Sequence, residues 1–396
     1  MYIRKIIKIR LIVSFSVLIF LIIVNNYLNF NIINNVSNII EYKNVSSGNE
    51  GISFDELSKV KDNYRNIEFT GCKEIKANVT NKYGVSPEKE IKTKIVLTDQ
   101  NYFDLYPFKV VRGGKIDPLS VKNGERVAII SDVLADSLFK SVDVIGSTLN
   151  IGSSKYKIEG VYKENKSLLY SAAEDGYERI YIPYTAYQDV NKKDKLCLDT
   201  MATKETKQYD EKAINDKLSK VLNDKLALYK SVNYTVSKNI VLQTVKILYF
   251  MIGIIIISFL IKRLVKLICK ANLLLKENLK SNYLKEALLN NKKQFFIFAA
   301  RIVICILAMV MVFNIVKFNL VIQDRYLPSN NIFDVDFYRK AIISNMQLNN
   351  ANENGIENVY SRYITIVGNV EKIIFCAEIF TIVEVIINQK IYHCET

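Results

Sequence analysis

The 396-residue sequence has few of the residues on which catalytic and metal sites usually depend. It contains one histidine, His393, which argues against a histidine-based catalytic triad and against a metal site with several histidines. Its six cysteines show no C-x-x-C spacing, the pattern expected of a zinc site or a redox-active dithiol. The sequence has no G-x-x-x-x-G-K-[ST] phosphate-binding loop. We therefore predict no catalytic, cofactor-binding or metal-binding residues, and no enzymatic activity.

The sequence carries an excess of positive charge, and the position of this charge along the chain indicates which kind of partner it suits. Lys and Arg number 54 against 40 Asp and Glu, a formal net charge of +14. Much of the excess lies beside strongly apolar segments, where cytoplasmic loops of membrane proteins collect Lys and Arg. Tyrosine is abundant, but aromatic and basic residues do not interleave as they do in a base-stacking surface. The charge therefore indicates a lipid bilayer as a partner and no nucleic acid.

Hydrophobic residues make up 49% of the chain and gather in several segments. The first segment, 1–24, has four basic residues among its first ten and continues from 11 to 24 as an uninterrupted run of apolar or small residues. A cleaved signal peptide is the alternative, but no small-x-small cleavage site follows the run. We therefore expect an uncleaved signal anchor with its N-terminus in the cytoplasm, which places 25–239 outside the cell membrane.

The remainder, 240–396, is predicted to be a membrane domain, with apolar helices near 240–261, 295–316 and 372–388. Between the first two helices, 262–294 holds nine basic and two acidic residues, which predicts a cytoplasmic loop. The stretch 324–370 is polar and mixed in charge, as expected of an external loop. Together with 1–24, these segments predict a multi-pass cell-membrane protein with about four transmembrane helices.

The helix near 372–388 is the weakest of the four. It is short, and Glu378 and Glu384 fall inside it. Carboxylates in hydrocarbon are costly unless they face a partner helix or water. An interfacial helix is therefore the alternative for this segment.

The segment 99–187 carries an ordered series of strand and helix signals. A β-branched run at 127–130 predicts a buried strand. Ser131 or Asp132 can cap the helix that follows, because their side chains accept hydrogen bonds from free backbone amides. A hairpin is predicted at 148–161, where residues alternate between two faces on either side of a Gly-Ser-Ser turn.

Further signals flank this segment. Ser53 and Glu56 have the spacing of a capping box at the start of an amphipathic helix. Alternating residues near 67–79 and 92–97 predict two strands. The helical spacing at 214–222 predicts a second amphipathic helix, which either packs on the domain core or leads back to the membrane.

The order of these pieces resembles the extracytoplasmic core domain of MacB-type and FtsX-type ABC transporter permeases. Some other mixed α/β extracellular domain is the alternative. The resemblance implies an α+β extracytoplasmic domain inserted between about four membrane helices. The matching residues are Arg112-Gly113-Gly114, 127–130, 135–139, Ile145-Gly146, 158–161 and 180–183.

The resemblance implies a permease-like subunit, which couples ATP hydrolysis by a separate ATPase subunit to movements of the extracytoplasmic domain. The substrate of such export or mechanotransmission would be a peptide, an antibiotic or a lipid-linked molecule. ATP would be bound by the partner, so this chain would need no cofactor. A second copy of the chain or a second permease subunit would complete the membrane part. In the family a cytoplasmic loop delivers a short helix to the ATPase, and the matching residues here are Tyr283, Leu284, Ala287 and Leu288.

Two questions stay open at the level of sequence. The small-residue turn usual in this loop is replaced by Asn290-Asn291, which keeps a second hypothesis in view: a non-transporting, membrane-anchored sensor or interaction protein that regulates cell-envelope processes. Cys72 and Cys197 are the only cysteines in 25–239, so they either form a disulfide or remain two free thiols.

Overall fold

The computed structural model describes residues 2–46, 50–80, 90–188, 196–206, 209–280, 283, 286, 289, 291–322, 328, 331, 333–341, 343 and 359–394. The chain divides into two compact units. The first unit comprises 1–26, 242–322 and 371–396, and the second comprises 27–241 and 323–370. The turn predicted at 84–89 and the polar loop at 189–195 lie outside the described residues.

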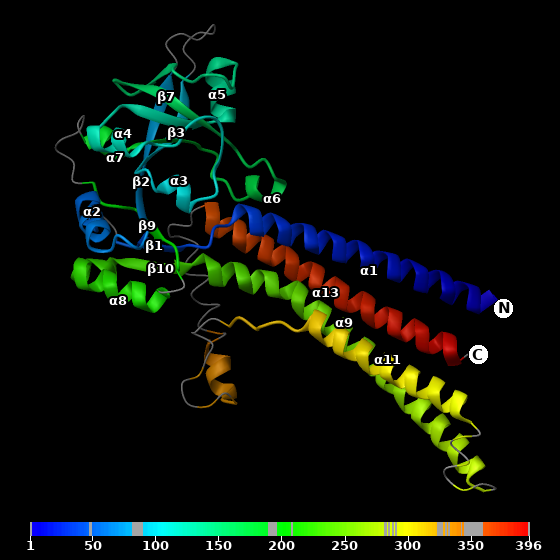
Figure 1. Cartoon of the computed structure of the whole chain (residues 1–396). Coiled ribbons are helices and arrows are strands. Elements are labelled where there is room, and N and C mark those ends of the chain that lie inside the picture. Colours follow the sequence, from blue (N-terminus) through cyan, green and yellow to red (C-terminus); the bar gives the residue numbers. More distant parts are fainter. Residues whose placement is uncertain are drawn as a thin grey trace. The chain divides into compact units, whose positions relative to one another are not determined.

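The second unit is built on a ten-stranded sheet with the order β10-β1-β9-β2-β3-β8-β5-β7-β4, in which β6 pairs with both β2 and β7 (Figure 1). Most neighbours are antiparallel, while β3 with β8 and β5 with β7 are parallel. The strands are β1 (Ile40–Asn44), β2 (Phe69–Thr80), β3 (Ile91–Thr98), β4 (Lys109–Gly113), β5 (Val127–Ser131), β6 (Thr148–Ile151), β7 (Ser154–Lys163), β8 (Glu178–Pro183), β9 (Thr200–Thr203) and β10 (Tyr229–Asn233).

Short helices connect these strands and cover the sheet. They are α2 (Phe54–Asn63), α3 (Tyr102–Leu105), α4 (Pro118–Asn123), α5 (Asp132–Phe139), α6 (Leu168–Ser171), α7 (Tyr184–Gln188), α8 (Glu211–Leu222) and the 3₁₀ helix η1 (Asn223–Leu228). The main core lies where α2, α5 and α8 pack on one face of the sheet, through residues such as Leu57, Leu134 and Leu218. A smaller, largely aromatic cluster lies on the opposite face.

Local sequence signals form as predicted in this unit. Ser53 and Glu56 make the reciprocal hydrogen bonds of a capping box at the start of α2. Ser131, and not Asp132, caps α5, since its hydroxyl accepts a hydrogen bond from the Leu134 amide. The second strand of the hairpin, β7, alternates between buried and exposed residues over its first half. The amphipathic helix at 214–222 is part of α8, and its apolar face packs on the core.

Two glycine positions let β4 and β7 approach closely. Gly113 has φ +68°, a left-handed conformation that side chains disfavour. A Cβ placed on Gly160 would lie 2.1 Å from the carbonyl oxygen of Gly114. The backbones at this crossing therefore leave no room for a side chain at 160.

The long helices of the chain are α1 (Tyr2–Asn35), α9 (Tyr234–Asn278), α11 (Lys292–Val316) and α13 (Val359–Cys394). Among the described residues, three helical stretches are long and apolar enough to cross a membrane: Lys5–Asn35, Tyr234–Asn278 and Lys292–Val316. The predicted class, a mixed α/β domain between apolar helices, is thus confirmed. The segment predicted at 372–388 is helical, but α13 is not one of these three stretches.

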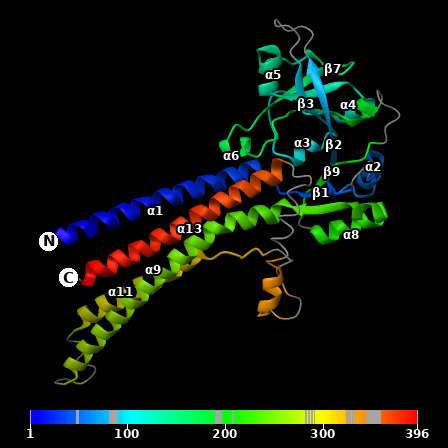
Figure 2. The ribbon, with the colours of Figure 1, turned by 180° about the vertical axis from the view of Figure 1, so that it is seen from behind.

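Within the first unit, α1 runs alongside α13 (Figure 1, Figure 2). Asn25 of α1 donates a hydrogen bond to the Glu378 carboxylate of α13, with N–O distances of 3.3 and 3.4 Å. Asn26 donates one to the hydroxyl of Tyr249 on α9, at 2.6 Å. Polar side chains therefore join these apolar helices.

Two helices extend beyond the lengths that apolar runs predict. α9 continues to Asn278, because 262–278 contains neither glycine nor proline and is rich in Leu and Lys, which are good helix formers. α13 begins at Val359, inside the stretch predicted as an external loop. Its first turns bury residues at helical spacing, a periodicity that the intervening polar residues obscure: Tyr360, Tyr363, Ile364 and Val367.

Candidate functional site

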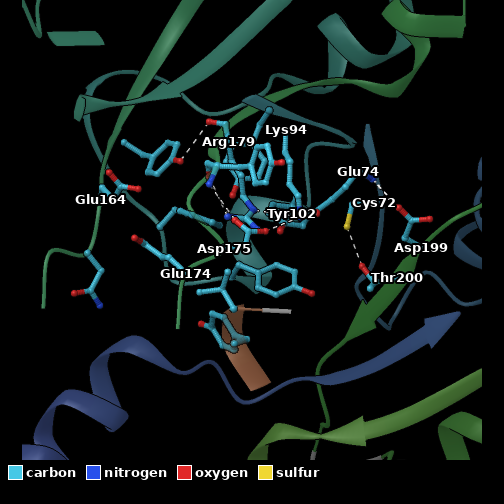
Figure 3. Close-up of a pocket in the computed structure, with 18 of the residues that line it drawn as sticks. Cys72, Glu74, Lys94, Tyr102, Glu164, Glu174, Asp175, Arg179, Asp199 and Thr200 are labelled. Atoms are coloured by element: carbon cyan, nitrogen blue, oxygen red, sulfur yellow. Dashed lines mark hydrogen bonds and ion pairs between the residues drawn. The ribbon is translucent and has the colours of Figure 1, made fainter. Parts of the chain in front are cut away.

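The second unit contains a cavity of about 500 Å³ on the sheet face opposite the main core. Strands β1, β9, β2, β3, β8 and β7 contribute side chains to it, as do α3, α6 and the first residues of α13. Its volume lies within the range of small-molecule sites in proteins. Figure 3 shows the cavity with the side chains that line it.

Strand alternation explains how charged residues reach this face. Successive side chains of a strand point to opposite faces of the sheet. Ile95 of β3 and Ile180 of β8 therefore enter the main core, while their neighbours Lys94 and Arg179 line the cavity. On β2, Glu74 also lines the cavity.

Four of these charged side chains form a closed ion-pair network. Lys94 Nζ lies 2.8 Å from Glu74 Oε2 and 2.6 Å from Asp175 Oδ2. Arg179 approaches the same two carboxylates, Nε at 3.2 Å from Glu74 Oε1 and Nη2 at 2.9 Å from Asp175 Oδ2. Burial alone would raise the pKa of the Asp175 carboxyl, but the hydrogen bond from Lys94 and the charge of Arg179 lower it below its usual value. Two cations and two anions make the network neutral.

Aromatic rings form a second part of the lining. Tyr181 packs edge-on against Tyr162 and Phe108, with ring centroids 5.6 and 5.2 Å apart. Tyr102 stacks on Tyr106 at 4.4 Å. Burial raises the pKa of the Tyr102, Tyr162 and Tyr181 hydroxyls well above the usual value, so these groups stay neutral. The wall therefore adds aromatic rings and neutral hydroxyls to the lining.

Glu164 and Glu174 differ from the other carboxylates of the lining in their charged surroundings. Figure 3 shows both on one side of the cavity, with Cys72, Thr200 and Asp199 on the opposite side. In the part of the chain that the structure describes, neither forms an ion pair. Burial, together with the charges of Glu178, Glu174 and Asp132, raises the pKa of Glu164 to about 7. Burial and Glu178 also raise the pKa of Glu174, against the opposing effect of Arg179.

The two cysteines of the second unit, Cys72 and Cys197, are buried and form no disulfide, which answers the open question in favour of two thiols. Cys72 Sγ lies 2.8 Å from Thr200 Oγ1 at the edge of the cavity. Burial raises the pKa of the Cys72 thiol well above its usual value, so it remains protonated.

The cavity therefore has the features of a binding site. Within the described ranges, no group of three or more His, Cys, Asp or Glu side chains is placed to hold a metal ion. The lining combines a neutral ion-pair network, an aromatic wall and two carboxylates that form no ion pair with any described residue. Such a surface can bind and orient a ligand through stacking and charge.

Of the residues predicted to contact an ATPase, the structure describes Tyr283, which is 84% exposed and does not line the cavity. Leu284, Ala287 and Leu288 lie outside the described residues. The cavity itself was not predicted. Its one visible signal is that Glu74, Lys94 and Arg179 each directly precede an isoleucine in or beside a predicted strand.

The fold defines a class: a membrane protein in which a mixed α/β domain of extracytoplasmic type is inserted between apolar helices. The family model of the MacB-like periplasmic core domain matches residues 11–220, more than half of the chain. The chain belongs to this family. The resemblance to MacB-type permeases predicted from the sequence is thereby confirmed.

A curated relative and two solved structures illustrate the similarity. The chain is 26% identical over 87 residues to the uncharacterized ABC transporter permease YvrN of Bacillus subtilis. This match covers 22% of this chain and 21% of that protein's length. The periplasmic region of MacB from Actinobacillus actinomycetemcomitans is 14% identical with a TM-score of 0.42, covering 53% of this chain and 94% of that one. The extracellular domain of the noncanonic ABC-type transporter YknZ from Gram-positive bacteria is 17% identical with a TM-score of 0.38. This match covers 50% of this chain and 100% of that one.

Proposed function

We propose that the chain is a permease-type subunit of an ABC transporter, whose extracytoplasmic domain moves when a separate ATPase subunit hydrolyses ATP. The observation that carries this proposal is the MacB-like core domain inserted between the apolar helices α1 and α9. The sequence has no phosphate-binding loop of its own, so ATP binding is assigned to a partner. A second copy of the chain or another permease would complete the membrane part.

The proposed topology places the N-terminus and the 279–291 connection in the cytoplasm, and the second unit outside. Basic residues support this orientation, because they are concentrated before the apolar part of α1 and between the apolar parts of α9 and α11. We assign α13 as a fourth membrane helix. The hydrogen bond from Asn25 supports this assignment, since a buried carboxylate such as Glu378 needs a polar partner in hydrocarbon.

Coupling to the ATPase is assigned to Tyr283, Leu284, Ala287 and Leu288. These residues lie between α9 and α11, two helices that belong to the first unit from 242 onward. A short apolar helix that enters a groove on the ATPase buries leucine side chains, and a charge at such a position would be left unpaired. Leu288→Asp is therefore expected to abolish association.

The test is affinity purification of the tagged full-length protein in mild detergent, followed by mass spectrometry and an ATPase assay. We expect an ABC ATPase in near-equal amount with the wild type, and loss of both the ATPase and nucleotide hydrolysis with Leu288→Asp. Leu119→Asp is the matched control, because Leu119 is an exposed leucine of α4 in the second unit. Retained ATPase with Leu288→Asp would remove the coupling assignment. Recovery of a cell-wall hydrolase or a kinase in place of any ATPase would support the sensor hypothesis.

A further inference from the structure

Acidic side chains outnumber basic ones in the lining of the cavity. Four basic side chains line it, and the acidic ones are Glu41, Glu74, Glu164, Glu174, Asp175 and Asp199. Two of the basic residues, Lys94 and Arg179, are neutralised by Glu74 and Asp175 in the ion-pair network. The other two, Lys76 and Lys163, have exposed side chains.

Two of the remaining carboxylates, Glu41 and Asp199, have hydrogen-bond donors and a lysine nearby. Glu41 accepts hydrogen bonds from the Tyr106 and Tyr234 hydroxyls at 2.6 and 2.8 Å and lies 3.6 Å from Lys43 Nζ. Asp199 accepts one from the Glu74 amide at 2.8 Å, and Lys73 Nζ lies 3.6 Å from it.

Glu164 and Glu174 have no such cationic partner among the described residues. Partly buried carboxylates without a partner are costly, and a bound cation would remove that cost. The two side chains lie on the same side of the cavity, as Figure 3 shows.

The aromatic wall adds a second preference for cations. Ammonium and guanidinium groups are attracted to the faces of tyrosine and phenylalanine rings, and this attraction grows where water is excluded. The wall also offers apolar area to the body of a ligand. A cavity of about 500 Å³ accommodates a molecule larger than a metal ion or a simple ammonium ion.

We propose that this cavity binds an organic cation: an amine or guanidinium group held by Glu164 and Glu174, on an aromatic or aliphatic body that packs against the tyrosine wall. This inference goes beyond the proposed function, because it concerns binding by the extracytoplasmic domain without any ATPase. Loss of the ATPase assignment would therefore leave it standing, and its own failure would leave the transporter proposal untouched.

The probe is a set of three fluorescent molecules with one aromatic body: dansylcadaverine, which is cationic, dansylamide, which is neutral, and dansylglycine, which is anionic. Binding is measured by fluorescence anisotropy on the full-length protein in phosphatidylcholine nanodiscs at pH 8, with no nucleotide or ATPase present. We expect saturable binding of dansylcadaverine, and affinities at least about tenfold weaker for the other two, because only the amine pairs with the carboxylates.

Two double variants decide whether this binding occurs in the cavity. Glu164→Gln with Glu174→Gln keeps the shape of both side chains and is expected to weaken dansylcadaverine binding about tenfold or more. Asp62→Asn with Glu68→Gln removes the same charge from exposed positions of the same unit that do not line the cavity, and is expected to bind as the wild type does. Circular dichroism of both variants checks the fold.

A third variant keeps the proposal testable if the double cavity variant fails to fold. Phe108→Leu keeps an apolar side chain in the wall but removes its ring, and is expected to weaken binding of the cation severalfold. Equal affinity for the neutral and cationic probes, or unchanged affinity in the folded Glu164→Gln, Glu174→Gln variant, would overturn the proposal.

Discussion

Glu164 shows how the fold changes the chemistry of a single side chain. In the sequence it follows β7 as one of many glutamates, and nothing nearby distinguishes it. In the structure it is half-buried beside Glu178, Glu174 and Asp132, with Lys166 as an opposing charge. Its pKa is raised to about 7, so its charge changes near neutral pH and with it the attraction of the cavity for a cation.

The raised pKa predicts a pH-dependent cost to stability at Glu164. The folded protein holds the proton more tightly than the unfolded chain, whose carboxyl has a pKa near 4.5, so stability is lost as pH rises from about 4.5 through about 7. Gln cannot ionise and escapes this loss. We expect Glu164→Gln to raise the Tm of the second unit at pH 8 by about 2–4 °C, on the order of 1 kcal/mol after solvent screening, and to have little effect at pH 5.

The measurement follows tyrosine fluorescence on heating, since the chain has 24 tyrosines and no tryptophan. Glu68→Gln, at an exposed position, is the control and is expected to shift Tm equally at both pH values. An equal shift for Glu164→Gln at pH 5 and pH 8 would contradict the assignment of the raised pKa.

At the scale of elements, most helices and strands were visible in the sequence because their signals are local. Caps and alternation act between residues a few positions apart, so Ser53, Ser131 and the 148–161 hairpin could be predicted. The start of α13 and the end of α9 were missed, because helical periodicity there is mixed with polar and charged residues. Long helices continue where no glycine, proline or cap ends them.

The crossing of β4 and β7 gives a prediction at this scale. Gly160→Ala would place a Cβ 2.1 Å from the Gly114 carbonyl oxygen, and both neighbouring segments are backbone that cannot yield easily. We expect a loss of roughly 2–3 kcal/mol and a Tm lowered by about 5–10 °C. Gly114→Ala is the matched control: a Cβ there meets nothing within 4 Å, and we expect little change in Tm. Similar effects of the two substitutions would show that the close approach does not limit position 160.

At the scale of the whole molecule, we infer the membrane topology from the positions of apolar helices and basic residues along the chain. In the part of the chain that the structure describes, three helices are long and apolar enough to cross a membrane, and basic residues flank them unevenly. Membership of the MacB-like periplasmic core domain family, matched over 11–220, accounts for the domain between α1 and α9. The orientation of these parts across the bilayer is a proposal that can be tested directly.

Reporter fusions test that orientation. Alkaline phosphatase folds to its active form only outside the cytoplasm, so we expect activity when it is fused after Tyr170, in the second unit, and none after Leu289, between α9 and α11. A reporter that requires the cytoplasm is expected to give the opposite pattern at the same two positions. An active phosphatase after Leu289 would contradict the topology, because the basic segment 262–294 would then lie outside.

The sequence by itself determined the class of protein, the family and part of the series of strands and helices, because hydropathy, caps, turns and short motifs are properties of neighbouring residues. The strands β1, β9 and β10 were not predicted. Only the tertiary structure decided which residues meet in the cavity. Glu74 and Arg179 pair although 105 positions separate them, and Lys94 and Asp175 are 81 apart. Their meeting depends on the register of β2, β3 and β8, and no local pattern encodes a register between distant strands. The same is true of Glu164 and Glu174, which meet in the cavity and have no ion-pair partner among the described residues.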